Sequence, residues 1–364
     1  MIDLTRRDCL QQTMAALAAT GVSLSSARGT GSQGSYRPGI KLAEVPIAGD
    51  SKYQLARQMG ITHAVIGAPL SGIPRQQYME ALEKTKAAHD AVGMKIAAFE
   101  GGMPIRRACI LGTDGRDEEI ENWIAALEAV SKIGVRIVLW DWVAGPSAFA
   151  WVRTKRDALT RGGALTSEFD NGDAKKLGLT EFGEVSREKM WETVAYFLKA
   201  VIPVAEKYNV RMALHPNDPP LTPLRGIGRI ATSAADFRRI MDIVPSPVNG
   251  ITFCQANFSA MAGDNVYEMA TEFCKRKKIF FVHFRNIDGD REHFLEKFHD
   301  DGQIDMPRMM KIYHEFGFDG PMRPDHAPIM AGEKNDRPGY GTLGKIFAFG
   351  YMIGILQSLQ IPYE

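Results

Sequence analysis

The chain has 364 residues, of which 45% are hydrophobic and 24% charged, values of a globular protein that can bury a sizeable core without disulfide bonds. Its 44 lysine and arginine residues nearly balance its 43 acidic residues, which argues against a nucleic-acid-binding protein. The sequence contains no apolar run of eighteen or more residues, so it predicts no transmembrane span, and its four cysteines are too far apart to indicate a disulfide framework.

Residues 1–27 have the pattern of a secretory signal peptide. The pair Arg6-Arg7 precedes a weakly apolar stretch from Met14 to Leu24, and small residues follow at 25–27. This order is typical of exported proteins, and the arginine pair indicates the twin-arginine route to the periplasm or the medium. An amphipathic helix or a disordered tail is the alternative, in which case the protein is cytoplasmic. Residues 28–38, rich in glycine and serine, are predicted to form a flexible linker.

From residue 40 onward, short β-branched runs alternate with amphipathic helical stretches. We predict strands at 40–45, 63–67, 95–100, 136–141, 211–215, 250–254, 279–285 and 320–325. We predict helices at 76–92, 118–133, 189–208, 234–243, 264–275, 305–316 and 344–358. Eight such units within 39–364 predict an α/β fold, a single-domain (β/α)8 TIM barrel. The alternative, an open doubly wound sheet, needs a glycine-rich turn after its first strand, and none follows Val45.

Two segments interrupt the alternation. Residues 143–188 are polar and contain glycine, and we predict a long inserted loop after the fourth strand. Residues 327–343 form a second loop after the eighth strand. Loops at the carboxyl ends of barrel strands commonly cover a functional site.

Four residues with metal-binding side chains fall at the ends of successive predicted strands: His215, Cys254, His283 and Asp325. Consecutive strand ends are neighbours around one rim of a barrel, so these side chains are expected to converge. Two imidazoles, a thiolate and a carboxylate can bind a divalent metal. Each residue alone has an ordinary structural explanation, as a hydrogen-bonded core histidine, a small buried cysteine or a helix cap. Four together on consecutive strand ends favour a metal site.

The neighbouring residues extend this predicted site. Asn217 and Asp218 lie in a proline-rich turn that would hold a side chain rigidly for substrate contact. Arg285 and Asn286 supply a cation and an amide suited to a carboxylate or a polyol. His326 places a titratable imidazole directly after Asp325.

Two loop segments could also reach the site. Tyr340, between two glycines, could close over the site or could pack at the start of the last helix. Trp151 and Arg153 belong to the predicted loop after strand four and could exclude water.

From about Tyr196 to Ile355, the sequence resembles the mannonate dehydratase family of the xylose-isomerase-like barrel superfamily. The resemblance rests on six ordered motifs: 196–205, 215–220, 249–254, 281–286, 323–326 and 338–340. The N-terminal half matches only in layout, with Trp151–Thr154 similar to a substrate-loop motif.

The resemblance implies that His215, Cys254, His283 and Asp325 bind a divalent metal, usually Mn²⁺, and that His326 and Tyr340 transfer protons. Ligand softness alone would favour Zn²⁺ for a site with a thiolate, and Fe²⁺ is a further alternative.

Two local departures from the family pattern bear on substrate choice. Asn217 stands where the family usually has aspartate, and Gln255-Ala256-Asn257 stands where it usually has Thr-Gly-Ser. We expect these positions to face the substrate. An export signal is a third departure, since the family is ordinarily cytoplasmic.

The leading hypothesis for function is metal-dependent dehydration of a sugar acid, D-mannonate to 2-dehydro-3-deoxy-D-gluconate and water. A dehydratase of another aldonate or a metal-dependent sugar isomerase or epimerase is the alternative, although the latter mostly lack a thiolate ligand. A non-catalytic exported sugar-acid-binding protein would need no proton-transfer pair. The expected partner is a small sugar acid, and a homo-oligomer is compatible with the sequence.

Overall fold

The protein is described by a computed structural model that covers residues 39–44, 50–105, 107–145 and 151–364. The predicted signal peptide (1–27) and linker (28–38) lie outside the described residues. Residues 38–364 form one compact unit. Within the described ranges, no helix is long and apolar enough to cross a membrane.

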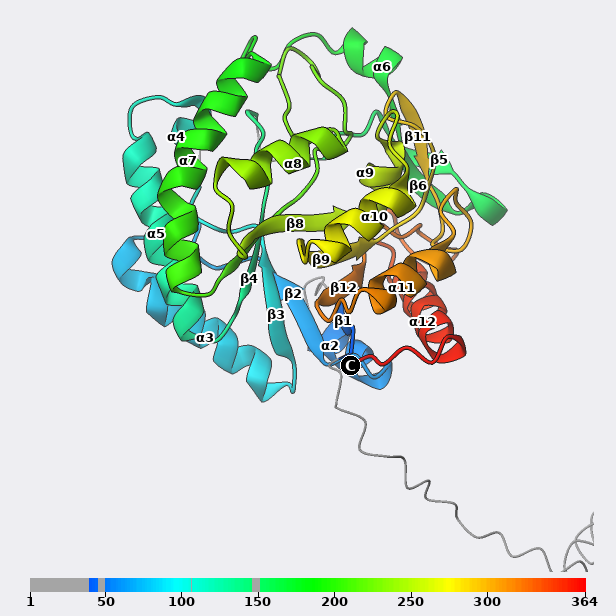
Figure 1. Cartoon of the computed structure of the whole chain (residues 1–364). Helices are drawn as coiled ribbons and strands as arrows, with labels where there is room; N and C mark the ends of the chain where they lie inside the picture. Colours follow the sequence, from blue (N-terminus) through cyan, green and yellow to red (C-terminus); the bar gives the residue numbers. More distant parts are fainter. Residues whose placement is uncertain (1–38, 45–49, 106, 146–150) are drawn as a thin grey trace, which may run out of the picture. The chain divides into compact units, whose positions relative to one another are not determined.

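The predicted TIM barrel is confirmed (Figure 1). Eight parallel strands close in the order β1-β12-β9-β8-β7-β4-β3-β2. Each observed strand coincides with a predicted one to within a few residues, and the bounds are β1 Lys41–Glu44, β2 His63–Ile66, β3 Lys95–Glu100, β4 Ile137–Trp140, β7 Arg211–Leu214, β8 Asn249–Cys254, β9 Ile279–Phe284 and β12 Pro321–Pro324.

Buried side chains explain why these short segments form the barrel. Every residue of β8 and β9 is buried, as expected for parallel strands covered by helices outside and by side chains inside. The buried apolar side chains form two clusters. The large cluster contains residues of both helices and strands. The small one comes from the barrel strands and includes Val65, Leu139 and Phe281.

Helices surround the barrel in the expected places (Figure 1). Side chains cap several of them: Ser186, for example, accepts a hydrogen bond from the Lys189 N–H at the start of α7. The predicted helices correspond to α3 Tyr78–Ala91, α5 Arg116–Lys132, α7 Arg187–Lys207, α8 Ala234–Ile243, α10 Val266–Lys275, α11 Met306–Glu315 and α12 Thr342–Ser358. The structure adds α2 Asp50–Gln58, α4 Arg107–Leu111, α6 Asn171–Lys176 and α9 Gln255–Ala260, which we did not predict.

The predicted insertion after the fourth strand is present, and it contains secondary structure that we did not predict. This segment contains β5 Lys155–Leu159 and β6 Leu165–Asp170, which pair antiparallel. They join β10 Ile287–Gly289 and β11 His293–Glu296 from the segment after β9, in a four-stranded sheet of order β10-β11-β6-β5. Because β5 is largely charged and exposed, it lacks the apolar alternation by which strands are predicted.

Candidate active site

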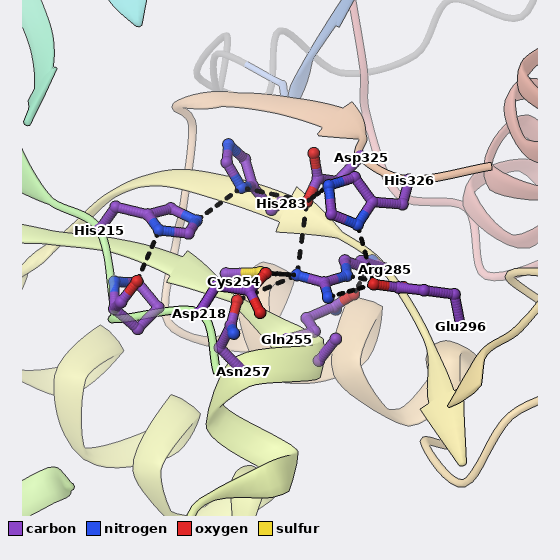
Figure 2. A network of polar contacts seen from close by, with 12 residues as sticks. His215, Asp218, Cys254, Gln255, Asn257, His283, Arg285, Glu296, Asp325 and His326 are labelled. Atoms are coloured by element: carbon purple, nitrogen blue, oxygen red, sulfur yellow. Dashed lines mark hydrogen bonds and ion pairs between the residues drawn. The ribbon is translucent and has the colours of Figure 1, made fainter. Parts of the chain in front are cut away.

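The four predicted metal ligands converge at the carboxyl ends of the barrel strands (Figure 2). His215 follows β7, Cys254 ends β8, His283 lies in β9 and Asp325 follows β12, and these strands are adjacent in the barrel. The ligand atoms of His215, Cys254 and His283 all lie within 4.8 Å of one another. Asp325 Oδ2 lies 3.6 Å from His283 Nδ1. The structure therefore brings together the side chains that the sequence placed on separate strands.

A hydrogen bond at His215 and a contact with Glu100 at His283 turn both imidazoles toward a shared point. His215 Nδ1 lies 2.7 Å from the Pro216 carbonyl oxygen, to which it donates, so His215 Nε2 keeps its lone pair. His283 Nε2 lies 3.2 Å from Glu100 Oε1, which leaves His283 Nδ1 as the free nitrogen. The two free nitrogens face each other at 3.1 Å. Two nitrogens bound to one ion at about 2.1 Å would lie about 3 to 3.4 Å apart, so this spacing fits a common metal.

The protonation of these groups also suits a metal. Burial lowers the pKa of His215 to about 4 and lowers the pKa of His283, so both rings are neutral near pH 7 and can act as ligands. Burial raises the pKa of the Cys254 thiol to about 12, against the effect of the Arg285 guanidinium. A thiol with so high a pKa needs a bound cation to become a thiolate, as in metal sites.

Asp325 is held as a carboxylate by the cations around it. Burial alone would raise its pKa, but the electrostatic effects of His326, Arg323 and Arg285 outweigh burial and hold the pKa well below its usual range. Arg323 Nη1 lies 2.9 Å from Asp325 Oδ1. The four donors together fit a divalent metal ion.

The two predicted proton-transfer residues lie beside this cluster. The rings of His326 and Tyr340 have their centroids 5.4 Å apart, and Trp151 contacts both, at 5.1 Å from His326 and 6.4 Å from Tyr340. Burial and the charge of Asp325 raise the pKa of Tyr340, so its phenol keeps its proton at neutral pH. The hydroxyl of Tyr340 is therefore a potential proton donor.

A buried charge cluster lies next to the metal-ligand side chains (Figure 2). Asp218 and Glu296 each accept hydrogen bonds from both Arg153 and Arg285. Glu296 also accepts from His326 Nδ1 at 2.9 Å. Burial would raise the pKa of Glu296, but Arg285, His326 and Arg153 outweigh it and lower the pKa. Arg285 extends from this cluster to within 3.4 Å of the Cys254 sulfur.

A cavity of about 490 Å³ opens above these residues, within the size range of small-molecule sites. Its wall combines the polar groups with an apolar side formed by α4 and nearby aromatic residues. The polar lining residues include Glu100, Asp141, His215, Asp218, His283, Arg323, Asp325, His326 and Tyr340. Trp151 also lines the cavity.

The structure does not bring four of the predicted substrate-binding residues to this wall. The guanidinium groups of Arg153 and Arg285 donate hydrogen bonds to Asp218 and Glu296. The Asn286 amide binds the backbone of the segment that follows β11, donating to the carbonyls of residues 299 and 304. Asn217 accepts from the Ala231 N–H, and all four side chains are buried.

The positions that depart from the family pattern also contact protein rather than the cavity. Gln255 accepts a hydrogen bond from the Arg285 N–H, and Asn257 accepts one from the Arg285 guanidinium at 3.0 Å. That these positions face the substrate stays a prediction. They hold Arg285, which lies beneath the metal-ligand side chains.

Sequence reasoning missed three acidic residues of the site. Glu100 and Asp141 are the last residues of the predicted strands 95–100 and 136–141. The position at a strand end, by which we predicted the metal ligands, could therefore have identified them as well. Glu296 had no such signal, because it ends β11 of the added sheet, which was not predicted.

Comparison with known proteins places this site in a family. The chain matches the family model described as D-mannonate dehydratase over residues 51–181 and 173–363. Mannonate dehydratase from Streptococcus agalactiae serotype Ia is 30% identical over 341 residues, which span 86% of this chain and 95% of that protein. Mannonate dehydratase from Thermotoga petrophila is 31% identical over 340 residues, with 84% and 92% of the two chains covered.

Solved structures share the fold. The crystal structure of mannonate dehydratase from Streptococcus suis serotype 2 covers 90% of this chain and 98% of its own, with a TM-score of 0.80 and 24% identity. A xylose isomerase domain protein from Planctomyces limnophilus covers 89% and 99%, with a TM-score of 0.57 and 11% identity. The sequence matches, over most of the chain, show that this protein belongs to the D-mannonate dehydratase family.

Proposed function

We propose that this protein is a metal-dependent hydro-lyase that converts D-mannonate to 2-dehydro-3-deoxy-D-gluconate and water. The observation that carries the proposal is the convergence of His215, Cys254, His283 and Asp325 on one rim of the barrel, with His326 and Tyr340 beside them. Membership of the D-mannonate dehydratase family supports this substrate and this reaction.

His215, Cys254, His283 and Asp325 would hold the metal ion, which we propose to be Mn²⁺, with Fe²⁺ and Zn²⁺ as alternatives. When bound, such an ion acts as a Lewis acid that polarises a sugar acid's carboxylate and makes the neighbouring C2 proton more acidic. The thiol proton of Cys254 must leave on binding, so the apparent metal affinity rises with pH.

His326 is suited to remove the C2 proton. Its Nδ1 donates to Glu296, so Nε2 carries the lone pair and can accept a proton. Glu296 is itself fixed by two arginines, which holds the imidazole in one orientation. This arrangement resembles the carboxylate–histidine pairs that orient general bases in other enzymes.

Tyr340 is suited to protonate the leaving hydroxyl. Its raised pKa keeps the phenol protonated, which a general acid requires. The C2 proton passes to His326, the C3 hydroxyl leaves with the Tyr340 proton as water, and the resulting enol rearranges to the 2-keto acid. The solvent returns the proton to Tyr340 and accepts the proton from His326.

We propose direct substrate contacts for Asp218 and Trp151, which line the cavity. Arg153, Arg285, Asn286 and Asn217 would act from behind the wall, because their polar groups bind other parts of the protein. Arg153 and Arg285 neutralise Asp218 and Glu296, and Glu296 in turn orients His326. Asn286 and Asn217 bind backbone groups of neighbouring segments.

A panel of aldonates, assayed for 2-keto acid with and without Mn²⁺, Fe²⁺ or Zn²⁺, tests the proposal. We expect metal-dependent keto acid from D-mannonate and little from other aldonates. Keto acid from a different aldonate alone would identify another dehydratase. Interconversion of neutral sugars without keto acid would identify an isomerase or epimerase, and binding without turnover would identify a sugar-acid-binding protein.

We also propose that residues 1–27 direct twin-arginine export. The support is the sequence pattern alone: Arg6-Arg7, a weakly apolar segment and small residues before the linker. Export of a folded protein would suit an enzyme that acquires its metal before leaving the cytoplasm.

A further inference from the structure

One carboxylate in the cavity wall forms no ion pair within the described residues, unlike the others. Glu100 pairs with Arg323 at 2.7 Å, and Asp325 pairs with Arg323 at 2.9 Å. Asp218 pairs with Arg153 and Arg285 at 2.8 and 2.9 Å. Asp141 lines the same cavity and is exposed there, and it forms no hydrogen bond or ion pair with the residues that the structure describes. Its oxygens are therefore available to a ligand.

The barrel places Asp141 beside the metal-ligand side chains rather than among them. It directly follows β4, which lies between β3, ending at Glu100, and β7, preceding His215. His215 is the nearest proposed metal ligand, and the other three come from β8, β9 and β12, on the side of β7 away from β4. A sugar acid held by its carboxylate end at those ligands has four further carbons to place in the cavity. Asp141 faces the space that remains on the β4 side.

The carboxylate of Asp141 determines which ligand groups can bind beside it. An ionised carboxylate accepts hydrogen bonds and donates none, so it complements the hydroxyl groups of a sugar chain. A carboxylate or phosphate in the same place would meet an unpaired negative charge at short range, which is strongly unfavourable. Asp141 opens into the cavity, where desolvation by the surrounding protein raises its pKa and the charge of Arg229 partly opposes this.

We propose that Asp141 is a specificity-determining residue, which binds hydroxyl groups of the sugar chain on the β4 side of the cavity and rejects sugar acids that have a second acidic group there. This inference rests on the proposed function, since it takes the substrate to be a monocarboxylic sugar acid held by its carboxylate at the metal. It adds a contact that the metal and proton-transfer residues do not provide.

The test compares D-mannonate with the diacid that has a carboxylate in place of its C6 hydroxyl. Affinities are measured by calorimetry on the metal-loaded protein, and turnover by keto-acid release, for wild type, Asp141→Asn and Asp141→Ala. We expect Asp141→Ala to weaken D-mannonate binding by about tenfold, because hydrogen bonds to a charged group are lost. We expect Asp141→Asn, which keeps the shape and removes the charge, to raise the affinity for the diacid relative to D-mannonate by about tenfold or more.

Asp157→Asn is the matched control, because it removes the same charge from β5 at an exposed position outside the cavity wall. It should leave both affinities unchanged. Asp141 has no protein partner in the described chain, so its variants should unfold at the wild-type temperature, which separates a binding effect from misfolding. Unchanged affinity for D-mannonate and unchanged discrimination against the diacid in both Asp141 variants would overturn the inference.

The result also separates this inference from the proposed function. A wild-type protein that binds D-mannonate without releasing keto acid contradicts the proposed reaction, and the affinity ratio of the two acids still decides the role of Asp141. A wild-type protein that binds neither acid contradicts both proposals.

Discussion

Cys254 is the residue that most clearly distinguishes a metal site from a buried polar cluster. Its thiol is fully buried and has a pKa raised to about 12, so without a cation it would be a neutral hydrophobic group. Its position beside two neutral imidazoles makes it a ligand only if a metal displaces its proton.

Cys254→Ser should therefore reduce bound metal by at least about tenfold, because a hydroxyl is a far poorer anionic ligand than a thiolate. Elemental analysis of purified protein measures the stoichiometry. Cys274→Ser is the control, since Cys274 is also buried but lies on α10, and it should keep its metal. Full metal content in Cys254→Ser would show that the thiol is not a ligand.

Removing only the phenol oxygen of Tyr340 distinguishes an effect on catalysis from an effect on binding. Tyr340→Phe should keep metal and substrate affinity while turnover falls on the order of 10²–10⁴-fold, the usual contribution of a general acid. Tyr196→Phe, which removes an exposed hydroxyl bonded to Asp117 away from the cavity, should turn over normally.

Proton exchange identifies the step that Tyr340 serves. If Tyr340 protonates the leaving hydroxyl, its phenylalanine variant should still exchange the C2 proton with deuterium from solvent, whereas His326→Asn should not. Turnover of aldonates by Tyr340→Phe at the wild-type rate would mean that Tyr340 is structural and that the proposed mechanism is wrong.

At the scale of elements, the added antiparallel sheet supplies the residue that orients the proposed base. Glu296 ends β11, whose neighbour β6 comes from the segment after β4, and its carboxylate reaches His326 after β12. Three separate parts of the chain thus meet at one histidine. The added sheet therefore contributes to the site directly, because it places the buried Glu296 carboxylate beside His326.

Glu296→Gln should lower kcat by roughly 10- to 1,000-fold, with little change in KM or metal content, because the imidazole loses its fixed orientation and charge partner. Steady-state kinetics and elemental analysis measure the three quantities. Glu168→Gln is the control in the same sheet, since Glu168 pairs with the exposed His293 outside the cavity. Equal losses in kcat and metal content for Glu296→Gln would instead indicate a general collapse of the site.

At the scale of the whole molecule, the export proposal concerns residues outside the described structure. Replacing Arg6 and Arg7 with lysine should retain the protein in the cytoplasm, because the twin-arginine route requires the arginine pair. Immunoblots of periplasmic and cytoplasmic fractions measure the distribution, and Lys41→Arg, a conservative change within the barrel, serves as the control. Unchanged export of the lysine variant would show that 1–27 is not a twin-arginine signal.

The sequence by itself determined the barrel and the convergence of His215, Cys254, His283 and Asp325. Both followed from local patterns: short buried strands alternate with helices, and the carboxyl ends of consecutive parallel strands must meet at one rim. Once an apolar strand is recognised in the sequence, the position of a ligand at its carboxyl end can therefore be predicted.

Tertiary structure alone decided which polar groups face the cavity and which support its wall. Arg285 and Asn286 follow a predicted strand, yet their side chains bind Glu296 and the backbone that follows β11, because the added sheet brings those partners beneath the site. Glu296 reaches His326 only because β11 pairs with β6, more than 100 residues earlier in the chain. Such pairing depends on long-range packing of charged, weakly patterned strands, for which no local signal in the sequence exists.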